Sequence, residues 1–269
     1  MNQAQESALA TLRDATGDRF PRASAYDIQW ILSRSMGPNP LWLTEWLCEQ
    51  MELHSGMRVL DLGCGMGLSS IFLAQEYGVQ VWAADLWIRP TQISENVLAA
   101  GLSDQVFPIH ADARKLPFAE RFFDAILCVD AYIYFGTDDL YLDHLVDFVR
   151  PEGQIGITVP GFTQKVRDTL PEHLRPFWAQ ECWSWHTVDW WRWLWQRTGL
   201  VSVETADSLP DGWKLWAAWE RAVHALEHPE ATEDDPGPDA AVLLADQGRY
   251  MGFHRMVARR HPAAAPSQR

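Results

Sequence analysis

The sequence has only four cysteines, and none of them form a paired motif. Cys48, Cys64, Cys128 and Cys182 are spaced neither as a C-x-x-C pair nor as the ligands of a zinc site. Two of them lie in apolar, strand-like surroundings, which is typical of reduced, buried thiols. The cysteines therefore predict no metal site, and we expect the protein in a reducing cytoplasm.

Positive charge is also scarce. The 22 Lys and Arg residues stand against 36 Asp and Glu residues, which gives a formal net charge of −14. Such a field repels a phosphate backbone or an anionic membrane unless a local basic patch intervenes. The most basic stretch holds only Arg255, Arg259 and Arg260, and we interpret it as a solvated strand face. Charge therefore disfavours nucleic-acid and membrane partners.

Long apolar runs are absent, since none approaches the length of a membrane span. The first 18 residues are polar and mixed in charge, unlike a signal peptide. Tryptophan, in contrast, is abundant: most of the 15 lie between Trp178 and Trp219. With 269 residues and 47% hydrophobic content the chain can bury one sizeable core, and length alone permits one or two domains.

Short apolar runs alternate with helical patterns in the middle of the chain. Strands are predicted at residues 58–62, 79–84, 105–110, 123–129 and 154–159, and helices at 68–77, 90–100 and 138–149. Strands separated by helices of this length indicate parallel β-α-β units with right-handed crossovers. The pattern predicts an α/β fold with a core at residues 57–160.

The flanking segments differ from this core. Residues 1–56 contain two helical patterns, at 1–16 and 41–53, and are predicted to form an N-terminal helical cap. Residues 161–199 form an aromatic-rich insertion. Residues 200–260 carry strands at 200–205 and 250–258, a helix at 212–226 and an acidic loop at 227–239. We expect a single domain over residues 1–260 and a disordered tail at 261–269.

A glycine turn joins the first strand to its helix, where residues 59–67 read VLDLGCGMG. Glycine is needed where the backbone turns sharply and a ligand approaches closely. Dinucleotide-binding turns read G-x-G-x-x-G and face a pyrophosphate, whereas here Gly67 comes one residue early and Asp61 stands two residues before Gly63. An acid beside the turn suits an amino group, and S-adenosylmethionine carries an α-amino group and no phosphate.

Two further acids follow the next two strands. Asp85 closes the second strand, where an acid can accept hydrogen bonds from both ribose hydroxyls. Asp112 follows the third strand, where an acid can accept from an exocyclic amine such as adenine N6. An aspartate at a strand end is also a common helix cap. The three successive acids together favour a ligand site.

These motifs resemble those of the class I S-adenosylmethionine-dependent methyltransferases. The residues that carry the resemblance are 59–67, Asp85, Asp112 and 129–132. The sequence is most similar to the small-molecule branch that includes the ubiquinone/menaquinone methyltransferases, over residues 40–160. The resemblance implies a Rossmann-like, seven-stranded, mostly parallel sheet with an antiparallel last strand and helices on both faces. The aromatic insertion, or lid, would follow strand 5.

The resemblance also implies a cofactor site for S-adenosylmethionine. Asp61, Gly63 and Gly65 would surround the methionine moiety. Asp85 would bind ribose, with Leu86 beside the adenine. The full set of expected cofactor-binding residues is Asp61, Gly63, Cys64, Gly65, Gly67, Asp85, Leu86, Asp112, Ala113, Val129 and Asp130.

Four side chains are candidates for the transfer chemistry: His186, Asp130, Tyr132 and Tyr134. The protein must exclude water, align the acceptor and, for a hydroxyl or a protonated amine, remove a proton. The two tyrosines are better suited as pocket walls, because an unperturbed phenol stays protonated at neutral pH. Asp130 can instead cap or orient the loop, and His186 can instead begin a helix.

The aromatic residues leave several interpretations open. The tryptophans at 178–195 form either a lid over the acceptor or part of the core, and a lid would favour a flat, apolar or cationic acceptor. Trp87 either stacks on adenine or packs against the next helix. Tyr26 and Trp30 either close on the methionine end or pack within a helix.

The sequence thus predicts an S-adenosylmethionine-dependent methyltransferase that acts on a small-molecule acceptor, planar and aromatic or amine-bearing. The leading alternative is a non-catalytic, cofactor-binding partner or regulatory protein, which the intact glycine turn and acids argue against. A nicotinamide dehydrogenase is disfavoured by the early third glycine. A thiol relay like that of arsenite methyltransferases is disfavoured because Cys64 and Cys128 lie in the turn and in a strand.

Overall fold

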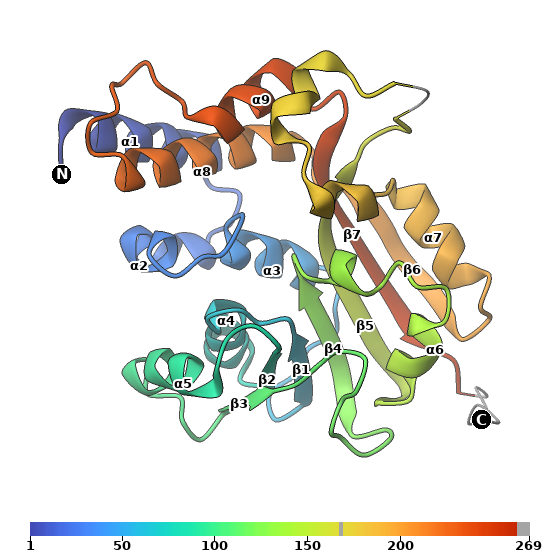
Figure 1. Ribbon diagram of the computed structural model, residues 1–269. Helices are drawn as coiled ribbons and strands as arrows, with labels where there is room; N and C mark the ends of the chain where they lie inside the picture. The colour runs from blue at the N-terminus through green and yellow to red at the C-terminus, as the bar shows by residue number, and fades with distance from the viewer. Residues whose placement is uncertain (167–168, 263–269) are drawn as a thin grey trace.

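The computed structural model of the chain describes residues 1–166 and 169–262. Within them a seven-stranded sheet has the order β3-β2-β1-β4-β5-β7-β6 (Figure 1). The strands are β1 (Arg58–Leu62), β2 (Gln80–Asp85), β3 (Val106–His110), β4 (Phe123–Val129), β5 (Val149–Phe162), β6 (Val201–Ser208) and β7 (Met251–Arg260). β7 pairs antiparallel with β5 and β6, whereas the other pairings are parallel. The predicted fold class is confirmed.

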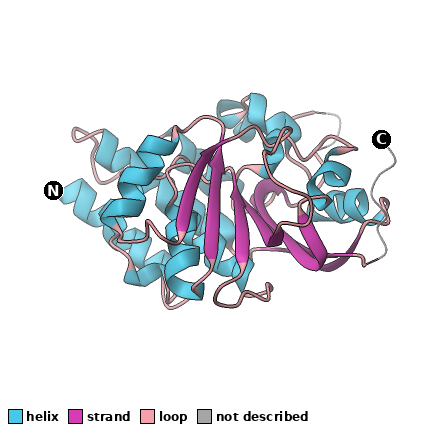
Figure 2. Ribbon diagram, turned by 90° about the horizontal axis from the view of Figure 1, so that it is seen from below, coloured by secondary structure: helices cyan, strands magenta, loops and turns pink. Residues whose placement is uncertain are grey.

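Helices cover both faces of this sheet (Figure 2). They are α1 (Gln3–Thr16), α2 (Ile28–Leu32), α3 (Pro40–Cys48), α4 (Leu68–Tyr77), α5 (Pro90–Ala99), α6 (Tyr141–Val146), α7 (Val188–Gln196), α8 (Gly212–Glu227) and α9 (Pro238–Asp246). Short 3-10 turns include η2 (Tyr132–Tyr134), η3 (Glu172–Phe177) and η4 (Gln180–Ser184). None of the helices among the described residues is long and apolar enough to cross a membrane.

The central strands bring the predicted cofactor motifs together at one edge of the sheet. β1 and β4 are almost entirely buried, as expected for parallel strands covered on both faces. In the sheet register Asp61 lies between Ala83 of β2 and Leu127 of β4. Because parallel strands all end on the same side, the loops after β1, β2, β3 and β4 meet there, at the carboxyl edge of the sheet.

The structure departs from the sequence prediction at β5, which begins at Val149 where a helix end was predicted, and again after residue 226. Much of the predicted acidic loop at 227–239 is irregular, but α9 begins at Pro238, where proline suits the first helical turn. His261, predicted to begin the tail, donates its backbone N–H to the carbonyl of Leu200 at 3.0 Å. Residues 263–269 lie outside the described residues.

Candidate active site

The loop between β1 and α4 needs glycine for two physical reasons. Its three glycines have left-handed φ angles of 77° (Gly63), 53° (Gly65) and 83° (Gly67), a region that side chains disfavour. A Cβ on Gly63 would lie 2.3 Å from the Cβ of Ala131, and one on Gly67 would lie 2.7 Å from Cγ2 of Ile93. The loop is therefore fixed by backbone shape and close packing together.

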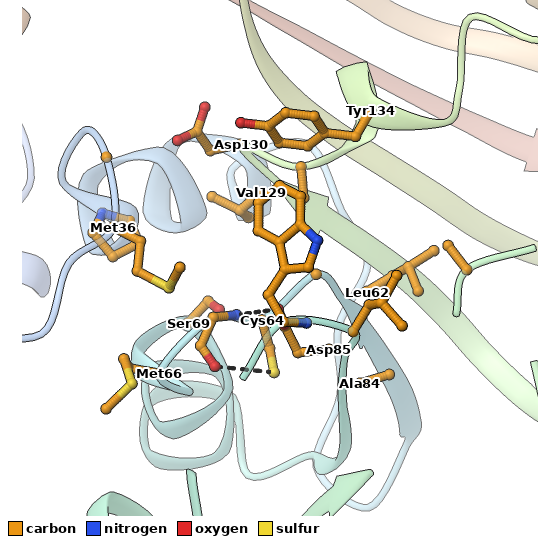
Figure 3. A pocket seen from close by; sticks show the side chains of 18 of the residues that line it. Met36, Leu62, Cys64, Met66, Ser69, Ala84, Asp85, Val129, Asp130 and Tyr134 are labelled. Atoms are coloured by element: carbon orange, nitrogen blue, oxygen red, sulfur yellow. Dashed lines mark hydrogen bonds between the residues drawn. The ribbon is translucent and has the colours of Figure 1, made fainter. Parts of the chain in front are cut away.

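A cavity of about 350 Å³ lies against this loop at the carboxyl edge of the sheet, and we call it the first cavity (Figure 3). Its wall is built from the glycine loop, the ends of β2, β3 and β4, and residues 34–38 with Pro40. It brings together nine of the residues predicted to bind the cofactor: Gly63, Cys64, Gly65, Asp85, Leu86, Asp112, Ala113, Val129 and Asp130.

Asp85 anchors the loop at this cavity. Its Oδ2 accepts a hydrogen bond from the backbone N–H of Gly65 at 2.8 Å, and Oδ1 accepts from those of Trp87 and Ile88 at 2.7 and 2.8 Å. A carboxylate offers about four acceptor positions, so roughly one remains for a ligand. Asp85 therefore both shapes the glycine loop and presents a carboxylate to the cavity.

Asp112 lies on the same wall, after β3. Its Oδ1 accepts a hydrogen bond from the backbone N–H of Arg114 at 2.9 Å, so the side chain also stabilises its own turn. Arg114 lies 4.0 Å from the same oxygen and donates to the carbonyl of Tyr134 at 2.9 Å. His110, the residue at the end of β3, turns away and pairs its Nε2 with the carbonyl of Leu86 at 2.9 Å.

Asp61 occupies a different position from the predicted one, because its carboxylate is buried beneath the loop and does not line the first cavity. The hydroxyls of Ser69 and Ser70 both donate to its Oδ2 at 2.6 Å, and Oδ1 is buried without a partner among the described residues. Burial raises its pKa to about 6, against the effect of the serine hydrogen bonds. Asp61 thus reaches the cavity only through Ser69, which lines it.

Tyr132 corrects another expectation. It is fully buried and packs against Trp191, Trp195 and Tyr141 at ring distances of 5.6, 5.7 and 5.7 Å. Burial raises the pKa of its phenol well above the usual value. Because an acceptor in the first cavity cannot reach it, Tyr132 is a core residue and not a catalytic candidate.

His186 is also placed elsewhere. Its ring stacks on Trp190 at 3.6 Å and lines a separate, second cavity of about 570 Å³. Desolvation lowers the pKa of this histidine. The second cavity lies beside α7 and η4 and is lined mainly by aromatic side chains, including Trp178, Trp183 and Trp185. His186, a predicted catalytic candidate, therefore lines the second cavity and not the first.

Asp130 and Tyr134 do reach the first cavity. Asp130 has a left-handed φ of 59°, and burial, followed by the nearby charge of Glu220, raises its pKa to about 7. Tyr134 is 44% exposed, and its ring lies 4.9 Å from that of Trp87 in an edge-to-face arrangement. Burial and the charge of Asp130 raise the pKa of Tyr134 to about 12, so its hydroxyl stays protonated at neutral pH.

Sequence reasoning missed the segment that faces the glycine loop across the cavity. The sulfur of Met36 would lie 3.3 Å from a Cβ on Gly65, and the indole of Trp219 donates to the carbonyl of Gly37 at 2.9 Å. The Gly-Pro-Asn-Pro run at residues 37–40 was the available signal. Tyr26 lies just before α2, where it stacks on Trp30 at 6.2 Å and packs on Phe72 of α4 at 5.6 Å. Neither Tyr26 nor Trp30 lines the first cavity.

Comparisons with known sequences agree with this site. Residues 59–153 match a protein-family model described as a methyltransferase domain. Methyltransferase GfsG of Streptomyces halstedii is 32% identical over 43% of this chain and 42% of that protein. A demethylmenaquinone methyltransferase of Clavibacter sepedonicus is 35% identical over 50% of this chain and 53% of that protein. The matches thus span about half the length of these curated relatives.

Solved structures share the fold over more of the chain. Phosphoethanolamine N-methyltransferase 2 of Haemonchus contortus has a TM-score of 0.70 at 19% identity, over 93% of this chain and 60% of that one. A methyltransferase of Thiobacillus denitrificans has a TM-score of 0.65 at 19% identity, over 88% and 99%. Sheet order and glycine loop define a Rossmann-like methyltransferase fold. Over residues 59–153 the chain is similar to a methyltransferase domain, and it shares the fold of S-adenosylmethionine-dependent methyltransferases.

Proposed function

We propose that this protein transfers a methyl group from S-adenosylmethionine to a small-molecule acceptor. The observation that carries the proposal is the first cavity, where a glycine loop and the carboxylates of Asp85 and Asp112 meet at the ends of neighbouring strands. Its volume of about 350 Å³ falls in the range of small-molecule sites. A formal net charge of −14 opposes a nucleic-acid acceptor.

The residues of the cavity fit this cofactor. Gly63 and Gly65 line the cavity, so the methionine moiety would lie against their backbone. Oδ1 of Asp61, which has no partner among the described residues, would supply a negative charge behind them. Asp85 would accept a hydrogen bond from a ribose hydroxyl at its remaining position, and Asp112 with Ala113 would face the adenine. When bound, the cofactor supplies the electrophilic methyl group.

The acceptor would enter from the opposite side of the cavity. Met36, Asp130 and Tyr134 line that side together (Figure 3). Their side chains would exclude water and align the acceptor, which contributes to the rate by positioning. Asp130, with a pKa of about 7, suits a group that removes a proton near neutral pH.

Calorimetric titration of the purified protein with S-adenosylmethionine and S-adenosylhomocysteine tests the cofactor. We expect dissociation constants in the micromolar range, roughly −8 kcal/mol, and loss of binding in Asp85→Ala. Asp104→Asn is the matched control. Asp104 is exposed, so this substitution removes the same charge at a site away from the cavity. Absence of binding to the wild-type protein would disprove the proposal, and release of S-adenosylhomocysteine with an acceptor would support it.

A further inference from the structure

The acceptor side of the first cavity holds a carboxylate for which the described residues provide no ion pair. Asp130 lines the cavity, and no donor or cation contacts its side chain in the described part of the protein. Its backbone N–H donates to the carbonyl of Thr158 at 2.8 Å. A Cβ on Gly37 would lie 2.6 Å from Oδ2 of Asp130, so the carboxylate packs directly over the Gly37 backbone.

A second carboxylate stands behind the first. Glu220 lies on α8, accepts a hydrogen bond from the indole of Trp216 at 2.9 Å and has no ion pair among the described residues. The indole of its neighbour Trp219 donates a hydrogen bond to the carbonyl of Gly37, so α8 contacts the segment over which Asp130 packs. Burial raises the pKa of Glu220 to about 7. Two partly buried carboxylates without a counter-charge are costly, and a cation beside them would relieve that cost.

The described arginines that line the first cavity do not supply that cation. Two arginines line the first cavity, but Arg34 donates from Nε to Asn96 at 2.8 Å and Arg114 is engaged by Asp112 and the carbonyl of Tyr134. Figure 3 shows the hydroxyl of Tyr134 and the carboxylate of Asp130 pointing toward one another over the cavity. Aromatic ring faces attract cations, so Tyr134 adds a second group suited to positive charge.

We propose that the acceptor is a small molecule with a protonated amine, which is held by the carboxylate of Asp130 beside the ring of Tyr134. This inference rests on the proposed function, since it names the acceptor class of the same site. The ammonium N–H bond breaks and an O–H bond forms on the Asp130 carboxylate, which becomes neutral. The nitrogen lone pair freed by this transfer is then the nucleophile, and Asp130 afterwards releases its proton to solvent.

Calorimetry with two probes of equal shape tests the charge requirement. Benzylamine and benzyl alcohol are titrated into the wild-type protein and into Asp130→Asn, with and without S-adenosylhomocysteine. Asn keeps the size of the side chain and tolerates a left-handed φ, so the variant should fold. Glu181→Gln is the matched control, because it removes a charge close to Tyr134 from a residue that does not line the first cavity.

We expect benzylamine to bind about tenfold more tightly than benzyl alcohol, and Asp130→Asn to abolish this difference. Glu181→Gln should preserve it, and S-adenosylhomocysteine should bind all three proteins alike. Equal affinities for the two probes, or benzylamine binding unchanged in Asp130→Asn, would overturn the inference. Loss of S-adenosylhomocysteine binding in Asp130→Asn would also overturn it, since Asp130 would then serve the cofactor. If the wild-type protein binds benzylamine selectively but no cofactor, the proposed function fails and the amine site stands.

The pH dependence of benzylamine binding provides a second readout. Asp130 is faced by Glu220 from α8 and by Tyr134 from η2, while Arg34 and Arg114 line the same cavity. The affinity should rise as the pH rises through about 7, because Asp130 then loses its proton while the amine keeps its own. Glu220→Gln removes a neighbouring negative charge and should move this rise to lower pH. A pH-independent affinity would contradict the role of Asp130.

Discussion

The two cavities of this protein are built in different ways. One wall of the first cavity is the glycine loop after β1, whose backbone shape depends on glycine at Gly63 and Gly65. The second cavity is walled by large aromatic side chains from residues 162–190. A backbone wall cannot be changed without altering the fold, whereas a side-chain wall changes with single substitutions. The comparison predicts that a substitution in the glycine loop disturbs the first cavity more than a single side-chain substitution disturbs the second.

The largest expected effect is on the backbone wall. Gly63→Ala should abolish cofactor binding, because the added Cβ meets Ala131 at 2.3 Å and the φ of 77° strains an alanine. Gly101→Ala is the matched control: Gly101 has a φ of 71° and open space around it, so it incurs only the strain of roughly 1–2 kcal/mol. Calorimetric titration with S-adenosylhomocysteine compares the two. Equal binding by both variants would show that the packing against Ala131 is unimportant.

A smaller effect is expected at the buried acid behind that wall. Asp61 has a pKa of about 6, which burial raises above the usual value of an aspartate, so the folded state holds its proton more tightly than the unfolded state. The stability that this proton contributes is present below about pH 4 and is lost as the pH rises to about 6. Asp61→Asn does not titrate, so its Tm relative to the wild type should increase between about pH 4 and pH 7.

Thermal unfolding of the two proteins at several pH values measures this difference. Asp104→Asn is again the control, since this exposed residue should give a constant offset. Cofactor affinity of Asp61→Asn should fall at neutral pH, because the negative charge behind the glycine loop is lost. A Tm difference that stays constant with pH would mean that Asp61 is not protonated near pH 6 in the folded protein.

The smallest effect is expected at the second cavity. His186→Ala removes a ring stacked on Trp190 at 3.6 Å, but it leaves every residue of the first cavity in place. We expect the dissociation constant for S-adenosylmethionine to change by less than about twofold, or roughly 0.4 kcal/mol. Turnover with a working acceptor should change as little. A tenfold loss in either quantity would show that the two cavities act as one site.

The sheet and the glycine turn were predictable from local patterns. β1, β4 and α4 have the predicted bounds, since a buried strand or a helix closed by Gly78 is encoded by neighbouring residues. The candidate site was predicted less completely. Gly63, Gly65 and Asp85 line the cavity as expected, but the segment around Met36 and Gly37 comes from far away in the sequence and carries no periodic pattern.

The misplaced residues share one cause. Asp61 and Tyr132 lie next to loops that line the first cavity, as predicted. The direction of a side chain near the end of a strand, however, depends on what packs against it. Tyr132 is drawn into the core by Trp191 and Trp195 of α7, and Asp61 is held beneath the loop by Ser69 and Ser70 of α4. Neither partner can be inferred from the strand itself.

The sequence by itself determined the order of strands and helices, the glycine turn and the acids at the strand ends. These features depend on residues a few positions apart, whose spacing sets hydrophobic periodicity and backbone freedom. Only the tertiary structure decided that Asp130 lines the first cavity near Glu220, with no ion pair to either carboxylate among the described residues. It also separated His186 into a second cavity. Such assignments depend on long-range packing, because burial and the approach of distant side chains set both the direction and the charge of each group.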